Sequence, residues 1–176
     1  MQYNETQYLN DNQKLIARNN IGASGATNLL NGSFTGSLRS YNSAEESSDY
    51  SMGYYSVALG RGTKASGHAS HAEGVYTVAS GECSHAEGSS TTASGECSHA
   101  EGSSTTASER YSHAEGHQTI ASGEHSHAEG YHSIATAQSS HAEGWSTYSA
   151  SAGSHSEGFK TAAFGSSSHA EGEGIE

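Results

Sequence analysis

Small and polar residues alternate along this chain in a pattern that repeats every 14 positions. The string Ser-His-Ala-Glu-Gly begins at Ser70 and recurs at 14-residue steps as far as Ser168. One copy reads Ser-His-Ser-Glu-Gly, and Ser-Val-Ala-Leu-Gly at Ser56 extends the series backwards to nine copies. Because no insertion interrupts the series, each repeat is expected to stack directly on the one before it.

Fourteen residues are too few for a pair of helices, but they suit two short strands joined by two glycine turns. A second pattern between the copies, Thr-x-Ala-Ser-Gly, supplies the second strand and its turn. We therefore predict an all-β fold for residues 51–176, a parallel β-solenoid of about nine coils. With coils spaced at about 4.8 Å, the rod would be roughly 43 Å long.

Strand alternation predicts which side chains lie inside the solenoid, because successive residues of a strand point to opposite faces. In Ser-His-Ala-Glu, serine and alanine share one face, while histidine and glutamate share the other. A narrow coil has room inside only for the small face, so Ser, Thr and Ala should fill the interior. Such side chains bury little apolar area, at roughly 25 cal/mol per Å². We therefore expect a single chain to be marginally stable and several chains to associate.

Composition and charge exclude several classes of partner. The chain has 32% hydrophobic residues, 22 glycines and no proline, and its formal net charge is −12. Between Ala65 and Phe159, Arg110 is the only basic residue besides histidine. A nucleic-acid partner, which needs a basic face, is therefore not expected.

No apolar run approaches the roughly 20 residues of a membrane span, and the N-terminus does not read as a signal peptide, so we expect no membrane insertion.

The sequence Ser-Val-Ala-Leu-Gly at 56–60, followed by 14-residue copies with a mid-repeat alanine, resembles the head repeat of YadA-type trimeric adhesins. The resemblance covers residues 51–172 and implies a left-handed parallel β-roll with three chains around a threefold axis. In that family the Val and Ile/Leu positions of the motif face the other chains, and Val57 and Leu59 keep this chemistry. The next eight coils have His in place of Val and Glu in place of Leu.

We call the histidines and glutamates at these two positions the His/Glu ladder. Its members are His71, Glu73, His85, Glu87, His99, Glu101, His113, Glu115, His127, Glu129, His141, Glu143, His155, Glu157, His169 and Glu171. Glutamates stacked about 5 Å apart repel one another, and burying them unpaired is costly. We therefore predict that the ladder, together with Val57 and Leu59, forms the trimer core, with His donating hydrogen bonds to Glu between chains.

Two alternatives to this placement remain. The ladder could be an acidic face exposed to solvent, or it could bind a metal, since rings of histidines bind Zn²⁺ or Ni²⁺. Eight repeated sites favour a structural role, so no cofactor is expected. A buried ladder also predicts a pH effect: pairing with carboxylates raises a histidine pKa, whereas burial lowers it.

Aromatic residues gather in the late coils. Tyr131, Trp145 and Phe159 follow the motif glycine in three successive coils, and Tyr148 lies in the same part of the chain. One interpretation is a stacking platform for a host cell-surface glycan. The alternative, which we favour at this stage, is packing between chains.

The Ser-His-x-Glu residues of each repeat have the side-chain types of a hydrolase triad. Adjacent strand residues point to opposite faces, however, so Ser and His of one motif cannot pair as nucleophile and base. We therefore predict no catalytic residues and no enzymatic activity. Cys83 and Cys97 occupy one column in adjacent coils, and we expect free thiols because in-register parallel side chains seldom meet disulfide geometry.

The first 50 residues lie outside the repeat. Residues 9–20 predict a short helix, so we assign residues 1–22 to attachment or trimerisation and residues 23–50 to an irregular connector. The segment Ala-Arg-Asn-Asn-Ile-Gly at 17–22 is similar to one common in bacteriophage tail-fibre proteins. Together with the Ser-His-Ala-Glu-Gly arrays, this similarity implies a homotrimeric tail-fibre or receptor-binding protein of a virion, assembled in the host cytoplasm. Its N-terminal segment would dock onto other tail proteins.

Two other functions remain open at this point. The chain could be the head fragment of a bacterial trimeric autotransporter adhesin at the cell surface. It could also be a structural virion spacer that makes no contact with a receptor.

Overall fold

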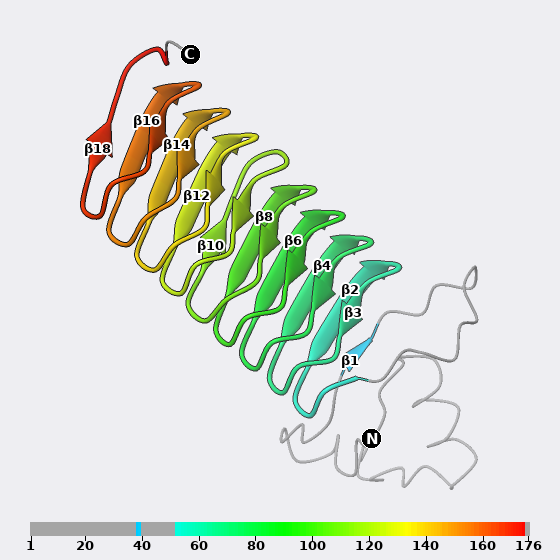
Figure 1. The fold of residues 1–176 in the computed structure, drawn as a ribbon. Coiled ribbons are helices and arrows are strands. Elements are labelled where there is room, and N and C mark those ends of the chain that lie inside the picture. The colour runs from blue at the N-terminus through cyan, green and yellow to red at the C-terminus, as the bar shows by residue number, and fades with distance from the viewer. Residues whose placement is uncertain (1–37, 40–51, 175–176) are drawn as a thin grey trace, which may run out of the picture.

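The computed structural model describes residues 38–39 and 52–174, and residues 52–174 form a parallel β-solenoid of eight complete coils (Figure 1). In seven of the eight coils a five-residue strand is followed by a two-residue strand, and in the fifth coil both strands have two residues. The ninth repeat contributes only β18 (His169–Ala170) to the described part of the chain. The prediction of an all-β solenoid with one repeat per coil is confirmed, with eight complete coils where about nine were expected.

The strands form two sheets, one on each side of the solenoid. The ten-stranded sheet contains β1 (Leu38–Arg39), β2 (Val57–Arg61), β4 (His71–Val75), β6 (His85–Ser89), β8 (His99–Ser103), β10 (His113–Ala114), β12 (His127–Tyr131), β14 (His141–Trp145), β16 (His155–Phe159) and β18 (His169–Ala170). The eight-stranded sheet contains β3 (Lys64–Ala65), β5 (Val78–Ala79), β7 (Thr92–Ala93), β9 (Thr106–Ala107), β11 (Ile120–Ala121), β13 (Ile134–Ala135), β15 (Tyr148–Ser149) and β17 (Ala162–Ala163).

Every strand pair from β2 onward is parallel, and each residue lies beside the residue 14 positions later. Strand β1 lies in the segment expected to be an irregular connector, and it pairs in parallel with Val57 and Ala58 of β2. Nothing in the sequence pattern indicates this strand. The predicted helix at residues 9–20 and the tail-fibre-like segment at residues 17–22 lie outside the described residues.

The interior consists of alanine, serine and threonine, as predicted. In the complete coils the alanines of both strands are buried, with Ser149 and Ser156 replacing alanine in the last two, and the motif serines and the threonine column are at most 5% exposed. Buried serines satisfy their hydroxyls locally: Ser70 and Ser98 each donate to the carbonyl oxygen three residues earlier, at 2.8 Å. Thr105 and Thr119 donate to carbonyl oxygens of Glu101 and Glu115 at 3.1 and 3.0 Å. The core therefore holds small side chains whose hydroxyls bond mostly to their own chain.

The motif glycine is required by two independent constraints. At Gly102 the backbone has φ of +102°, a region that residues with a Cβ rarely adopt. A Cβ at this position would overlap the carbonyl oxygen of Gly116 in the next coil. Adjacent coils therefore approach along this column as closely as two backbones can.

The other turns differ from the expected glycine turns. Two residues in most coils adopt a left-handed conformation without being glycine, such as Cys83 with φ of 54° and Ser90 with φ of 57°. Their amides donate to the preceding coil, Cys83 to the carbonyl of His68 and Ser90 to that of Val75, both at 2.8 Å. These inter-coil hydrogen bonds offset the strain of the left-handed turns, which is of order 1–3 kcal/mol for each residue.

Within residues 38–39 and 52–174, no helix is present that is long and apolar enough to cross a membrane.

Alanine substitutions at Gly102 and Gly172 should separate the effect of the positive φ from the effect of the close approach of the next coil. We expect Gly102→Ala to lower the free energy of unfolding by about 3 kcal/mol, because it adds a clash to the strain of the turn. The matched control is Gly172→Ala, where φ is +103° but no atom lies within 4 Å of the added Cβ. Urea denaturation should show a clearly smaller loss for the control; equal losses would contradict the close approach of the coils.

Candidate functional site

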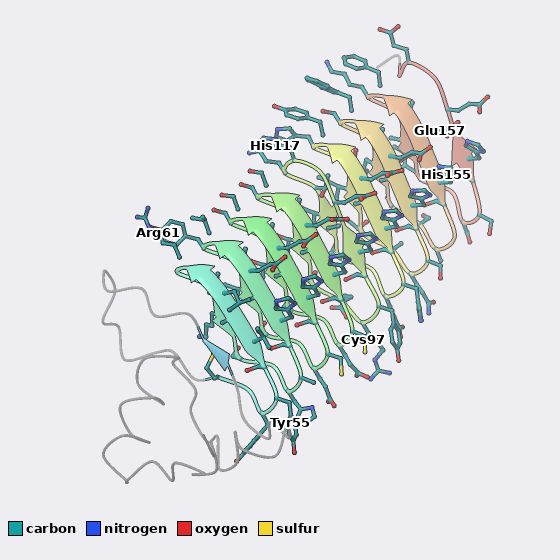
Figure 2. The ribbon with its side chains drawn as sticks, turned by 180° about the vertical axis from the view of Figure 1, so that it is seen from behind. Tyr55, Arg61, Cys97, His117, His155 and Glu157 are labelled. Atoms are coloured by element: carbon teal, nitrogen blue, oxygen red, sulfur yellow. The ribbon has the colours of Figure 1, made fainter. Side chains whose placement is uncertain are left out.

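The His/Glu ladder lies on the outward face of the ten-stranded sheet. Figure 2 shows its histidine rings as a row across the strands, with His155 and Glu157 labelled at one end. Side chains in the middle of the ladder are about one-third exposed, for example His127 at 35% and Glu115 at 34%. Val57 and Leu59 occupy the same two columns in β2, paired with His71 and Glu73 of β4. The face is therefore continuous along the whole solenoid and only partly covered within a single chain.

The histidines stack on one another. Ring centroids of successive histidines from His71 to His169 are 4.7 or 4.8 Å apart, and the ring planes are within 14° of parallel. The 14-residue register produces this arrangement, because each imidazole lies directly above its own copy in the preceding coil. Stacking closes the Nε2 atoms off from solvent. Those of His71, His85, His99, His113, His127, His141 and His155 are buried and have no hydrogen-bond partner.

Seven of the eight ladder histidines, all except His99, lie within 4 Å of a glutamate of their own coil or of the preceding coil. The Nε2 atom of His141 lies 3.8 Å from a carboxylate oxygen of Glu129 and 3.8 Å from one of Glu143. Across the ladder these distances run from 3.5 to 3.9 Å. They exceed the usual 2.7–3.2 Å of a hydrogen bond from nitrogen to oxygen. The interaction within one chain is therefore electrostatic, and the predicted hydrogen bonds between chains stay a prediction.

Burial decides the direction of the histidine pKa shifts. It lowers the pKa of His99, His127 and His141, and the neighbouring histidines of the stack lower it further. The nearby glutamates oppose this shift without reversing it. Of the two influences weighed from the sequence, desolvation therefore dominates at these three histidines.

Four successive glutamates of the column, from Glu115 to Glu157, interact through their carboxyl groups. Side-chain hydrogen bonds with Glu143 and Glu115, together with burial, raise the pKa of Glu129 to about 7. The same bonds lower the pKa of Glu115 and Glu143, while the bond with Glu143 raises that of Glu157. From Glu115 to Glu157 the direction of the pKa shift therefore alternates from one coil to the next, which reduces the repulsion between stacked charges in this part of the column.

The aromatic residues predicted as a possible glycan contact separate into two groups. Tyr131 and Trp145 stack with ring centroids 4.2 Å apart, and Phe159 follows at 6.2 Å from Trp145. His117 extends this row by stacking on Tyr131 at 5.1 Å. Figure 2 shows His117 at the same edge of the solenoid as Arg61, across from Tyr55 and Cys97. We call His117, Tyr131, Trp145 and Phe159 the aromatic stack.

Tyr148 does not join the aromatic stack. It lies in β15 of the eight-stranded sheet, and its ring contacts Phe164 at 5.9 Å. His117 was not among the predicted contact residues, although it directly follows the motif glycine in the same column as Tyr131, which was a sufficient signal. Trp145 and Phe159 are 48% and 41% exposed, so the stack offers ring surface to a ligand or to another chain.

Two further sequence predictions concern reactive side chains. Ser84 is buried while His85 points outward, so Ser and His of one motif lie on opposite faces as predicted. Cys83 and Cys97 are exposed free thiols, also as predicted.

The YadA head domain repeat matches two segments of the chain, residues 53–82 and residues 114–136. The first contains strands β2 to β5 and the second contains β11 to β13. Together with the parallel solenoid, these two matches support a YadA-type head β-roll. No curated protein matches the chain.

The ladder predicts opposing effects of pH on stability. The pKa values of His99, His127 and His141 are lowered from 6.5, so folding favours their neutral forms. Their contribution to the free energy of unfolding is therefore complete above pH 6.5 and is lost as the pH falls below that value. Glu129 acts in the other direction. Its raised pKa stabilises the fold fully below pH 4.5, and this contribution is lost as the pH rises to about 7.

Glu129→Gln isolates the glutamate contribution, because the glutamine amide can donate a hydrogen bond as the protonated carboxyl does. We expect this variant to melt roughly 2–5 °C above the unmodified protein at pH 8 and to show no advantage at pH 5. Thermal melts from pH 5 to 8 measure the difference. Glu171→Gln, at the exposed end of the ladder, serves as the control and should show little change. An equal effect at both pH values would contradict the raised pKa of Glu129.

Proposed function

We propose that this chain forms a homotrimeric rod that attaches to a host surface, with the His/Glu ladder of each chain directed towards the threefold axis. The observation that carries the proposal is the continuous, half-covered ladder face on a YadA-type β-roll. The apolar residues Val57 and Leu59 occupy the two positions of that face which contact neighbouring chains in the family.

The thinness of the core supports association. Its buried hydrophobic cluster consists of alanines, and the remaining buried side chains are serines and threonines. Alanine buries little apolar area, so packing inside one chain gives a small hydrophobic gain for each coil. Contact between ladder faces would add buried area in every coil without changing the repeat.

Two shallow grooves on the ladder face fit a second copy of the chain. They run beside the glutamate column where the motif glycines leave no side chain. One is lined by Glu129, Gly130, Glu143, Gly144, Glu157, Gly158 and Gly172, and the other by Leu59, Gly60, Glu73, Gly74, Glu87, Gly88 and Gly102. Because both have the period of the coil, a parallel copy presents side chains at matching intervals. A partner with the same repeat is therefore the occupant that we propose.

The aromatic stack is the proposed contact with the host. Its rings form an exposed row about three coil spacings long, and aromatic faces pack well against the apolar faces of sugars. A glycan with several accessible sugar rings is the ligand class that such a row suits. We therefore assign the receptor contact to Tyr131, Trp145 and Phe159, with His117 at the end of the row, and leave Tyr148 outside it.

The biological setting that we propose is a phage tail fibre or receptor-binding assembly. The support is the tail-fibre-like segment at residues 17–22 and the long Ser-His-Ala-Glu-Gly array. In this setting the N-terminal segment would bind other tail proteins. The match to the YadA head repeat favours instead the head of a bacterial surface adhesin, which is the second candidate.

Light scattering behind a sizing column at pH 7.5 tests the trimer. We expect a mass of three times the chain's 18.2 kDa. Leu59→Lys should weaken the trimer by placing three ammonium groups near the axis. Ile120→Lys is the matched control, since Ile120 has the same 38% exposure but lies on the eight-stranded sheet. A monomeric mass for the unmodified protein would overturn the proposal.

Alanine substitutions test the receptor contact. We expect Trp145→Ala and Tyr131→Ala each to weaken binding of labelled protein to host cells by about tenfold or more, since a stacked ring contributes about 1–3 kcal/mol in other stacking recognition. Tyr148→Ala, from the same part of the rod, should leave binding unchanged. If all three variants form trimers and bind like the unmodified protein, the rod is a structural spacer.

A further inference from the structure

The histidine Nε2 atoms of the ladder have an unusual environment. Seven of them are buried without a hydrogen-bond partner, in one column and at a constant spacing. Buried polar atoms in folded proteins nearly always have a partner, because an unpaired one loses its bond to water. Because the same Nε2 atom lacks a partner in seven successive coils, we infer that one kind of ligand from outside the chain binds all of these atoms.

The distances around these atoms identify the kind of partner. Except at His99, the Nε2 atoms lie 3.5 to 3.9 Å from the nearest glutamate oxygens, which is too long for a hydrogen bond. Two ligands bound to one zinc ion at about 2.0–2.1 Å in tetrahedral geometry lie roughly 3.4 Å apart. The ladder atoms are therefore within a few tenths of an ångström of the separation that a bridging metal ion imposes.

The atoms also group into separate clusters of three. In each cluster the ligand atoms lie within 4.8 Å of one another. The clusters are Glu73–His85–Glu87, His99–Glu101–His113, Glu115–His127–Glu129, His141–Glu143–His155 and Glu157–His169–Glu171. No residue belongs to two of these clusters, but the clusters adjoin, because Glu129 of one lies 3.8 Å from the Nε2 atom of His141 in the next. Three ligands with a fourth position left open is a common arrangement around zinc.

From this geometry we propose that the His/Glu ladder binds divalent first-row transition-metal ions of the zinc type, with one ion in each His/Glu cluster. Imidazole nitrogen combined with carboxylate oxygen suits Zn²⁺, Co²⁺ and Ni²⁺, whereas Mg²⁺ and Ca²⁺ prefer oxygen ligands alone. This inference goes beyond the proposed attachment function and does not require it, because each cluster lies within one chain.

Neither water nor a neighbouring chain fits the position as well. The Nε2 atoms have almost no surface accessible to a water-sized sphere, so neither a water molecule nor a partner's side chain reaches them without movement of the stack. An ion that has shed its water occupies the space between nitrogen and oxygen directly. It also neutralises the carboxylates, which otherwise repel one another along the column.

Bound ions would also link adjacent coils. In the cluster Glu115–His127–Glu129, one glutamate lies in the coil before that of the histidine. An ion held by both coils clamps them together and stabilises the folded state in proportion to the logarithm of its concentration above the dissociation constant. Metal binding would thus strengthen a rod whose alanine core contributes little.

Equilibrium dialysis of the full chain against Zn²⁺, after removal of bound metal with a chelator, tests the proposal. We expect more than one and up to five ions for each chain, matching the number of clusters. Addition of Co²⁺ should give the intense visible absorption of a low-coordinate ion, and excess Zn²⁺ should abolish it. Binding of less than one ion for each chain, or a Co²⁺ spectrum equal to that of the hydrated ion, would overturn the proposal.

Histidines in one coil provide the matched variants. His127→Gln should remove one Zn²⁺ ion for each chain, because it deletes the imidazole of one cluster. His125→Gln and His132→Gln remove imidazoles that lie outside the ladder, where they contact Tyr111 and Tyr131. They should leave the number of ions unchanged. Loss of ions from these controls, or none from a folded His127→Gln protein, would show that the metal binds elsewhere. Light scattering of the same samples reports trimer formation separately.

Should His127→Gln fail to fold, Glu115→Gln provides a second deletion in the same cluster. It keeps the imidazole stack intact and removes one carboxylate ligand, so Zn²⁺ affinity at that site should fall at least tenfold while circular dichroism stays unchanged. Unchanged affinity would count against the cluster as the site.

Discussion

The strict 14-residue register is the constraint on which the rest of this structure depends. Because every coil lies on the one before it without a shift, each side chain meets its own copy about 4.8 Å away. This suits imidazole rings, which stack, and alanine, which leaves the interior narrow and uniform. It is unfavourable for glutamate, where like charges meet. In the middle of the column, hydrogen bonds with Glu143 and Glu115 favour the protonated form of Glu129 and raise its pKa to about 7.

Most of the fold could be predicted from the sequence because the repeat carries its own geometry. A period of 14 with no insertion leaves few architectures, and the alternation of small and large residues settles which face of each strand is buried. What could not be predicted depends on departures from the repeat. Strand β1 has no repeat motif, and pairs with β2 only because the folded chain brings Leu38 and Arg39 alongside it.

The candidate site also has a part that the sequence predicts, the face on which each residue lies, and a part that it does not, the contacts between side chains. Columns of equivalent residues were assigned correctly to one face, since position in the repeat fixes position on the surface. The contacts between columns were less predictable. That Glu129 approaches His141 of the following coil as closely as Glu143 does depends on the side-chain torsions, which no spacing argument provides. Likewise, Tyr148 is near the aromatic stack in sequence but lies on the other sheet.

The close contact at the motif glycine has a consequence for how such a chain can change its length. No side chain fits between neighbouring coils along that column, so any added coil must bring its own glycine in the same place. Recombination between nearly identical repeats meets this condition automatically. Gain or loss of whole repeats would therefore lengthen or shorten the rod in steps of about 4.8 Å while every column stays in line. A population of related genes could sample rods of different reach without ever passing through a misfolded intermediate.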